Sequence, residues 1–342
     1  MALLKRGGAR LVDTLTYVAG ARQPVRIEVP SRFMQTIWLN VQGLLTVSAV
    51  TVPGTVHLDG PANIIAQAEL LVDGKTIKIG SGPGFLRVAQ VYGQSDGVNN
   101  GLVGGAAGIY PFQAVIPLNF EAWSSVSPID TLLDGRFLKN MVLNITWGTP
   151  ASLVINNTST LAVTACTCEV YLEDTEPFDT PHGFWTQRET ETTFLNIVTA
   201  AQTRLAIPFT PGGVLRAVQL RSVDGLDLSD AVINSLSLRV NGEEFPLNQL
   251  EDDFLQAYNR YKFGRDFHAE GYIHLELAEN GRIAATGLGA KMEGMAVRDV
   301  DIIANTTVGA AGAAATSIVA HLIEHVPPEI MGVGIRPAAK AA

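Results

Sequence analysis

Apolar and polar residues alternate along most of this 342-residue chain, in short runs that often end at glycine, proline or asparagine. Two of these runs have nearly the same sequence: residues 70–75 read LLVDGK, and residues 238–243 read LRVNGE. A period of two predicts β-strands, and Asp-Gly or Asn-Gly directly after such a strand predicts a tight hairpin turn. We therefore expect one β-hairpin at each of these two sites.

The similarity between the two halves of the chain continues beyond the hairpins. Each hairpin is followed by a Phe-Leu pair, then by an apolar alternating strand, and finally by a strand that runs into acids and proline. The matched segments are residues 85–86 and 254–255, 141–147 and 300–305, and 161–173 and 317–326. The copies are offset by roughly 150–170 residues, which is about the size of a whole domain. The sequence thus predicts two similar β-domains in tandem.

Runs of strands with about one short helix per copy are typical of β-sandwiches and do not build a parallel α/β sheet. We expect an all-β fold of two tandem eight-stranded jelly-roll β-sandwiches, each with one or two short helices. The acidic, proline-containing string EDTEPFDTPHG indicates the connection between them. The expected divisions are a basic N-terminal arm over residues 1–24, a first jelly roll over 25–173, a linker over 174–185, a second jelly roll over 186–327 and a C-terminal tail over 328–342.

The helices are expected shortly after the two hairpins. In QLEDDFLQAYNRYKFG, residues 249–264, three acids precede Phe254 and two basic residues come near the end. A helix dipole favours this order of charges, so we predict a helix there. The counterpart in the first copy, GFLRVAQVYG over residues 84–93, predicts a shorter helix.

The first 24 residues differ from the rest in their charge. The basic residues there are Lys5, Arg6, Arg10 and Arg22. They are accompanied by a single acid, Asp13, and leucine and valine recur at helical spacing. Two interpretations stay open: a short amphipathic helix with a basic side, or a terminus that becomes ordered only on assembly. We read no secretion signal in this segment, and we expect removal of residues 1–22 to leave the fold intact.

Composition narrows the range of functions. Apolar residues make up 47% and charged residues 17% of the chain, which favours surfaces that are hidden between subunits. The formal net charge of −9 argues against direct nucleic-acid binding by the body of the protein. Cys166 and Cys168 lie two apart on one predicted strand, so both point to the same face and are expected to be buried free thiols.

Three strings match catalytic or binding motifs, and we assign a site to none of them. HLIEH (residues 321–325) has zinc-peptidase spacing, but it lies in an alternating strand, where Glu324 points away from both histidines. GQSDG (93–97) lacks the helix that a nucleophile elbow needs, and GSGPGF (80–85) is predicted to be a tight turn rather than a phosphate loop. We therefore expect no enzyme activity, no cofactor and no metal.

The second half resembles a known family of structural proteins. The resemblance lies in FWTQRETETTFLNIV (184–198), SDAVINSLSLRVNGEEF (229–245), FLQAYNRYKFG (254–264) and GYIHLELAENGRI (271–283), together with their order and the duplication. These features are similar to the double jelly-roll major capsid proteins of tailless icosahedral viruses, the lineage of tectiviruses, corticoviruses, autolykiviruses and, more distantly, adenovirus. The resemblance covers about residues 25–327 and is weaker in the first half.

The resemblance implies a major capsid protein, as of a bacteriophage, in the virion shell, made in the host cytoplasm. Three copies would form a pseudo-hexagonal homotrimeric capsomer that contacts neighbouring capsomers, vertex or penton proteins and minor capsid proteins. It also implies an internal lipid membrane beneath the shell, with Lys5, Arg6 and Arg10 as the candidate contact to that membrane or the interior. The alternatives are a tandem β-sandwich glycan-binding protein or glycan-acting enzyme, and a minor spike or vertex protein of such a virion.

Overall fold

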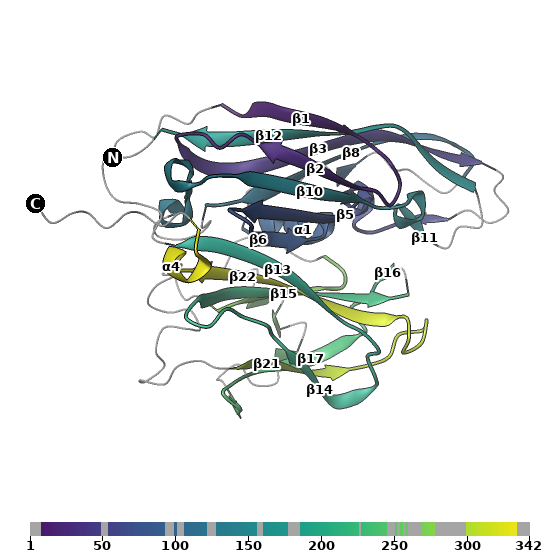
Figure 1. The fold of residues 1–342 in the computed structure, drawn as a ribbon. Helices are drawn as coiled ribbons and strands as arrows, with labels where there is room; N and C mark the ends of the chain where they lie inside the picture. Colours follow the sequence, from purple (N-terminus) through teal and green to yellow (C-terminus); the bar gives the residue numbers. More distant parts are fainter. Residues whose placement is uncertain are drawn as a thin grey trace, which may run out of the picture.

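Two β-sandwiches, one from each half of the sequence, lie side by side in the computed structural model (Figure 1). The structure describes residues 8–48, 54–92, 99–100, 106–121, 128–155, 160–176, 185–225, 227–244, 250–251, 254–255, 257–258, 269–277 and 299–333. Within these residues, no helix has both the length and the apolar character needed to cross a membrane.

In its described residues, the first sandwich has eight principal strands and one α-helix. The strands are β1 (Arg10–Thr16), β2 (Arg22–Ile27), β3 (Phe33–Ser48), β5 (Ile65–Val72), β6 (Lys75–Gly80), β8 (Gly108–Asn119), β10 (Met141–Trp147) and β12 (Thr160–Thr175). Helix α1 (Gly82–Val91) follows β6. The minor elements are the strands β4 (Thr55–Val56), β7 (Asn99–Asn100), β9 (Leu133–Asp134) and β11 (Val154–Ile155), and the 3-10 helices η1 (Gly60–Ile64), η2 (Pro128–Thr131), η3 (Gly135–Phe137) and η4 (Pro150–Ser152).

The second sandwich repeats this plan. Its principal strands are β13 (Thr186–Phe194), β14 (Ala200–Ala206), β15 (Val214–Asp224), β17 (Ile233–Val240), β18 (Glu243–Glu244), β20 (Tyr272–Glu276), β21 (Val300–Thr306) and β22 (Thr316–Val326). Residues 254–255 and 257–258 are helical, in agreement with the helix expected there. The minor elements are β16 (Asp227–Leu228), β19 (Leu250–Glu251) and helix α4 (Pro328–Met331).

The strand order shows that both sandwiches are jelly rolls. In the first, β1-β12-β3-β8 form one sheet and β2-β10-β5-β6 the other; in the second, the corresponding sets are β13-β22-β15-β20 and β14-β21-β17-β18. Counted along each copy, both sandwiches therefore have the orders 1-8-3-6 and 2-7-4-5. Eight antiparallel strands that alternate between two sheets in this way make a jelly roll, so the predicted fold class is confirmed.

Both predicted hairpins are present, and they occupy the same place in each jelly roll. Asp73-Gly74 joins β5 to β6 with φ values of 49° and 76°, and Asn241-Gly242 joins β17 to β18 with φ values of 53° and 81°. Two successive residues with positive φ form the turn whose twist matches a two-residue hairpin, and Asp, Asn and Gly adopt this conformation with little strain.

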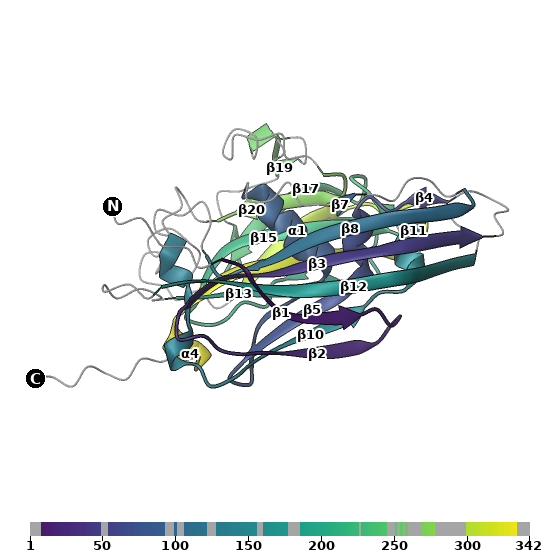
Figure 2. The ribbon, with the colours of Figure 1, turned by 90° about the horizontal axis from the view of Figure 1, so that it is seen from above.

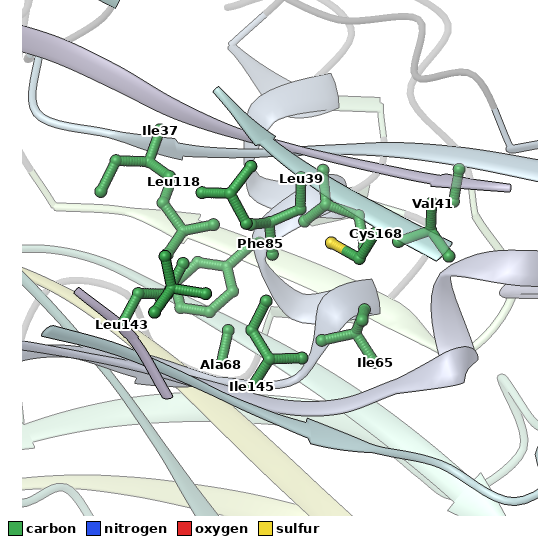
Figure 3. Packing of buried hydrophobic residues seen from close by; sticks show 14 of the residues in the cluster. Ile37, Leu39, Val41, Ile65, Ala68, Phe85, Leu118, Leu143, Ile145 and Cys168 are labelled. Atoms are coloured by element: carbon green, nitrogen blue, oxygen red, sulfur yellow. The ribbon is translucent and has the colours of Figure 1, made fainter. Parts of the chain in front are cut away.

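The core of the first jelly roll lies between its two sheets. Figure 3 shows Ile37 and Leu39 of β3 facing Leu143 and Ile145 of β10, with Phe85 of α1 between them. Burial of a side chain of this size stabilises the fold by roughly 1.5–3 kcal/mol. Cys166 and Cys168 are buried free thiols, as expected, and burial raises the pKa of Cys166 to about 12.

The N-terminal segment differs from the expected arm. Residues 10–16 form strand β1, which pairs with β12 from Arg10↔Leu172 to Thr16↔Thr167, so the first jelly roll begins well before residue 25. The helical interpretation is therefore wrong for these residues. Removing residues 1–22 would delete a principal strand, so the fold is not expected to tolerate this deletion.

Residues 328–333 also depart from the expected loose tail, and residues 334–342 lie outside the described structure. Helix α4 follows β22 directly, and Val333 beyond it is buried in the core of the first jelly roll, with Met331 packed against the same core. The chain thus returns from the second jelly roll to the first. Helix α4 lies at one end of the molecule, and β3, β8 and β12 run side by side towards the other end (Figure 2).

Candidate functional site

The basic residues singled out in the sequence lie partly outside the described structure. Lys5 and Arg6 fall in the undescribed residues 1–7. Arg10 lies in β1, where its guanidinium donates to the carbonyl of Glu28 at 3.1 Å and its Nε lies 3.8 Å from a carboxylate oxygen of Asp174. Arg10 therefore belongs to an ordered strand, and its charge is partly balanced.

The strings that match catalytic or binding motifs have structural roles where the structure describes them. HLIEH lies in strand β22: His321 contacts acids of β13 towards the first jelly roll, while Glu324 binds Arg188 at 2.8 Å on the other face. GSGPGF begins helix α1, with Ser81 as its N-cap, and so is more than the tight turn that was expected. GQSDG falls in the undescribed residues 93–98. Among the described residues, no group of three or more His, Cys, Asp or Glu side chains could hold a metal ion.

The strongest concentration of buried charge lies where the two jelly rolls meet. Strand β6 of the first pairs in parallel with β13 of the second at Glu189↔Lys78 and Thr190↔Ile79, which makes one continuous sheet across the molecule. Helix α1 packs beside this contact, with Val88 and Val91 against Ala217 and Ile323. We call this region the junction: β6, α1 and Asp59 on one side, and β13, β15, β20 and β22 on the other.

Lys78 is at the centre of the junction and is completely buried. Its Nζ lies 2.5 Å from Oε1 of Glu189, which in turn accepts a 2.9 Å bond from Gln187. His321 bridges two carboxylates, with Nε2 3.0 Å from Glu189 and Nδ1 3.2 Å from Glu191. Two acids thus surround two basic groups, and of the four side chains Glu191 alone is partly exposed.

Proton affinities in this cluster follow from its geometry. Burial favours the neutral forms, but Lys78 and His321 outweigh it at Glu189 and lower the pKa of that carboxyl to about 2. Burial likewise opposes charge on His321, but its hydrogen bonds to Glu189 and Glu191 raise the pKa of His321 to about 9. His325 is also buried, and burial together with nearby Arg216 lowers its pKa well below 6.5. At neutral pH His321 is therefore charged and His325 is neutral.

Glu191 ties the second jelly roll to the start of helix α1. Its carboxylate accepts from the backbone N–H of Ser81 at 2.7 Å and from the Ser81 hydroxyl at 2.9 Å. A carboxylate at a helix N-terminus satisfies free amide groups and interacts favourably with the helix dipole. A Cβ on Gly84 would lie only 1.9 Å from Oε1 of Glu191, so the glycine is needed for this close approach.

Two further groups of buried charges join the jelly rolls next to α1. In one, Tyr92 donates to Glu276 at 2.7 Å while the guanidinium of Arg216 lies 4.4 Å from the centre of the Tyr92 ring. Arg216 also pairs with Glu276 at 3.3 Å.

In the other group, Tyr272 donates to both carboxylate oxygens of Asp59, at 2.8 and 2.9 Å. Arg87 and Arg221 lie 3.4 and 3.6 Å from the same carboxylate. All three groups span the junction, so a rotation of one jelly roll against the other would separate buried charges. Breaking one buried pair leaves an uncompensated charge and costs several kcal/mol. The junction therefore fixes the angle between the two jelly rolls.

Few features of the sequence indicate that these residues meet. The string RETETT in β13 consists of charged residues and threonine, without an apolar side chain. Such a string ordinarily indicates a solvated strand. Its partners Lys78 and His321 lie 111 and 132 residues from Glu189 along the chain. The charged residues of this strand, in an otherwise apolar domain, were the one sign of a buried cluster. They do not show which residues they contact.

Solved structures with the same fold come from viral capsids. The chain matches no family model and no curated protein. A chain in the atomic structure of Sulfolobus Turreted Icosahedral Virus has 14% sequence identity and a TM-score of 0.69, over 94% of this chain and 91% of that chain. The PBCV-1 virus capsid model gives 10% identity and a TM-score of 0.64, over 95% and 94%.

The major capsid protein of bacteriophage PM2 aligns over 94% of this chain and 97% of its own length, with 10% identity and a TM-score of 0.59. Both jelly rolls and their relative arrangement are therefore shared with these structures nearly end to end. At such identities, what is shared is the fold: two jelly rolls in one chain, placed side by side.

Proposed function

We propose that this chain is a major capsid protein, a structural subunit of an icosahedral virion shell that acts as a homotrimeric, pseudo-hexagonal capsomer. The junction is the observation that carries this proposal. Buried ion pairs and a continuous sheet make two jelly rolls into one rigid unit. Three such units place six similar sandwiches in a ring, and a ring with hexagonal outline can tile a closed shell.

The remaining chemistry supports a structural role. The described surface has a hollow of about 410 Å³ around Gln42, Gly43 and Gln113 that is lined by no ionisable side chain. Smaller hollows are lined by Arg239 and by Arg26, Glu28 and Lys139. The buried ionisable groups of the junction are engaged with one another across it. This arrangement favours rigidity over turnover of a substrate.

The proposal predicts a stable trimer of the purified protein. Size-exclusion chromatography with light scattering at micromolar concentration should give three times the mass of the 36.5 kDa chain. Negative-stain electron microscopy should show particles with hexagonal outline. A monomer at this concentration would count strongly against the proposal.

Copy number in purified virions separates a shell protein, present in hundreds of copies, from a minor spike or vertex protein.

We further propose that the basic residues before β1 contact an anionic surface on the inner side of the shell, an internal membrane in the first place. Lys5 and Arg6 directly precede strand β1, which carries Arg10. A chain that lacks residues 1–7 keeps β1 and should fold and form trimers normally. Each basic residue near an anionic membrane contributes about 1 kcal/mol. Loss of two should weaken binding to phosphatidylserine vesicles roughly thirtyfold.

Vesicle co-sedimentation measures this binding, with neutral phosphatidylcholine vesicles as the lipid control. The double substitution Lys5→Gln with Arg6→Gln keeps the chain length and should reproduce the loss, while Lys5→Arg should not. Equal binding by the truncated and full-length proteins would refute this role for the segment.

A further inference from the structure

The two jelly rolls have the same fold, but they contribute different surfaces to the junction. The first jelly roll contributes the free side of β6 and the outward face of α1. The second contributes the free side of β13 and the outer face of β15 and β22. Each jelly roll has counterparts of both surfaces, because the two copies share one strand order. The contact inside the chain therefore uses the helix surface of the first jelly roll and the sheet surface of the second. It does not use the helix surface of the second jelly roll or the sheet surface of the first.

The unused surface of the second jelly roll is its own helix after the hairpin. Leu255 is buried in the core of this jelly roll, as Phe85 of α1 is in the first. Phe254 and Tyr258 face outward, with 55% and 41% of their surface exposed. Their rings are stacked, with centroids 6.3 Å apart and planes 18° apart. The spacing of four residues is the same as that of Val88 and Tyr92, which face the second jelly roll from α1.

The unused surface of the first jelly roll is the outer face of β3 and β12, the counterparts of β15 and β22. Trp38 and Tyr171 are register partners there and are half-buried, as Ala217 and Ile323 are register partners beneath α1. We call Trp38, Asn40, Glu169, Tyr171 and Glu173 the β3–β12 face. It lies uppermost in Figure 1, away from the second jelly roll.

Hydrogen bonds within the β3–β12 face hold its aromatic and acidic side chains in place. Glu169 accepts from Asn40 at 2.9 Å and from Tyr171 at 2.8 Å, and Glu173 accepts from Trp38 at 3.0 Å. Neither carboxylate forms an ion pair with any residue in the described ranges. These hydrogen bonds hold the rings of Trp38 and Tyr171 at the surface, where aromatic side chains of another chain can stack on them.

We propose that Phe254 and Tyr258 of one chain dock on the β3–β12 face of a second copy of the same chain. This contact would repeat, between chains, the contact that α1 makes inside each chain. Such a contact joins two different surfaces, so successive copies associate head to tail. A closed ring forms when the rotation between neighbouring chains is a whole-number fraction of a full turn. The proposal rests on the proposed capsomer and names the residues that hold it together.

Association of variants tests this contact. The double substitution Phe254→Ala with Tyr258→Ala should weaken self-association roughly tenfold or more in sedimentation equilibrium, because buried aromatic residues carry much of the binding energy at interfaces. Tyr171→Ala on the opposite surface should have a similar effect. The control is Leu195→Ala: Leu195 is 67% exposed in the same jelly roll but lies outside the helix, and its loss should change little. Circular dichroism checks that all variants fold, since the substituted side chains lie at the surface.

Crosslinking identifies the surface that receives the helix. A photoreactive benzoyl-phenylalanine in place of Phe254 should give covalent dimers on a denaturing gel, with the crosslink in residues 36–44 or 165–175 of the other chain. Oligomers that form crosslinks elsewhere, or whose association survives the double substitution, would overturn this contact and leave the proposed capsomer standing. A wild-type protein that stays monomeric would overturn the capsomer itself.

Discussion

Replacing Lys78 with methionine should lower the free energy of unfolding by about 3–5 kcal/mol, although methionine fills nearly the same volume. Lys78 is completely buried, and Glu189 beside it is almost so. Without the ammonium group, Glu189 loses one of its two buried ion-pair partners and keeps His321. The loss comes from the uncompensated carboxylate rather than from packing. Guanidinium denaturation followed by circular dichroism measures it.

Two controls separate charge from packing in this experiment. Lys75→Met removes a lysine from the exposed start of the same strand, β6, and should change stability by less than about 0.5 kcal/mol. The double substitution Lys78→Met with Glu189→Met removes both charges and should recover much of the stability, since apolar replacements of a buried pair are often neutral. A single Lys78→Met variant as stable as wild type would show that the junction does not depend on this pair.

Stability should also depend on the charge of His321, with a loss towards alkaline pH. The pKa of His321 is raised from 6.5 to about 9 in the folded chain. A raised pKa means that the charged form interacts favourably only in the folded state. This contribution is complete below pH 6.5, falls as pH rises through 9 and is absent above that. A shift of this size corresponds to about 3 kcal/mol.

Other groups of the junction act in the acidic range. The pKa values of Glu189 and Glu191 are lowered to about 2. Lys78 and His321 outweigh the effect of burial at Glu189, and His321 and Arg221 outweigh it at Glu191. Their contribution is present above pH 4.5 and is lost as pH falls towards 2. His325 stays neutral when folded, so its effect also lowers stability as pH falls below 6.5.

The difference between wild type and His321→Gln isolates the histidine. Unfolding should be measured for both proteins between pH 5 and 10, where Glu189 and Glu191 stay ionised. The wild-type advantage should be largest near pH 6, shrink as pH rises from 6.5 to 9 and be absent above that. A His325→Gln variant serves as the contrast, because its effect relative to wild type should change in the acidic range instead. An advantage of constant size across the range would contradict the assignment of charge to His321.

The duplication and the hairpins could be read from the sequence because they depend on local chemistry. Asp73-Gly74 and Asn241-Gly242 adopt positive φ in any context that permits a tight turn, and alternation marks the strands on both sides. Two copies with the same order of turns and strands make two similar domains. The fold class followed from these features alone.

Strand β1 was missed because its pattern is compatible with two structures. Leu11, Leu15 and Val18 fit a helical spacing, and β1 is an edge strand exposed on much of its surface, so it lacks the clear alternation of a buried strand. Its partner β12 lies more than 150 residues away in sequence, and the pairing Arg10↔Leu172 decides its conformation.

What the sequence alone determined about this protein is two β-sandwiches in tandem with hairpins at fixed places, since period and turn residues act over a few neighbours. Only the tertiary structure decided that Lys78, Glu189, Glu191 and His321 meet in a buried junction, and that Gly84 makes room for it. Charged residues in a strand look alike whether they face water or a partner. The difference is set by contacts between segments more than 100 residues apart, which no local pattern contains.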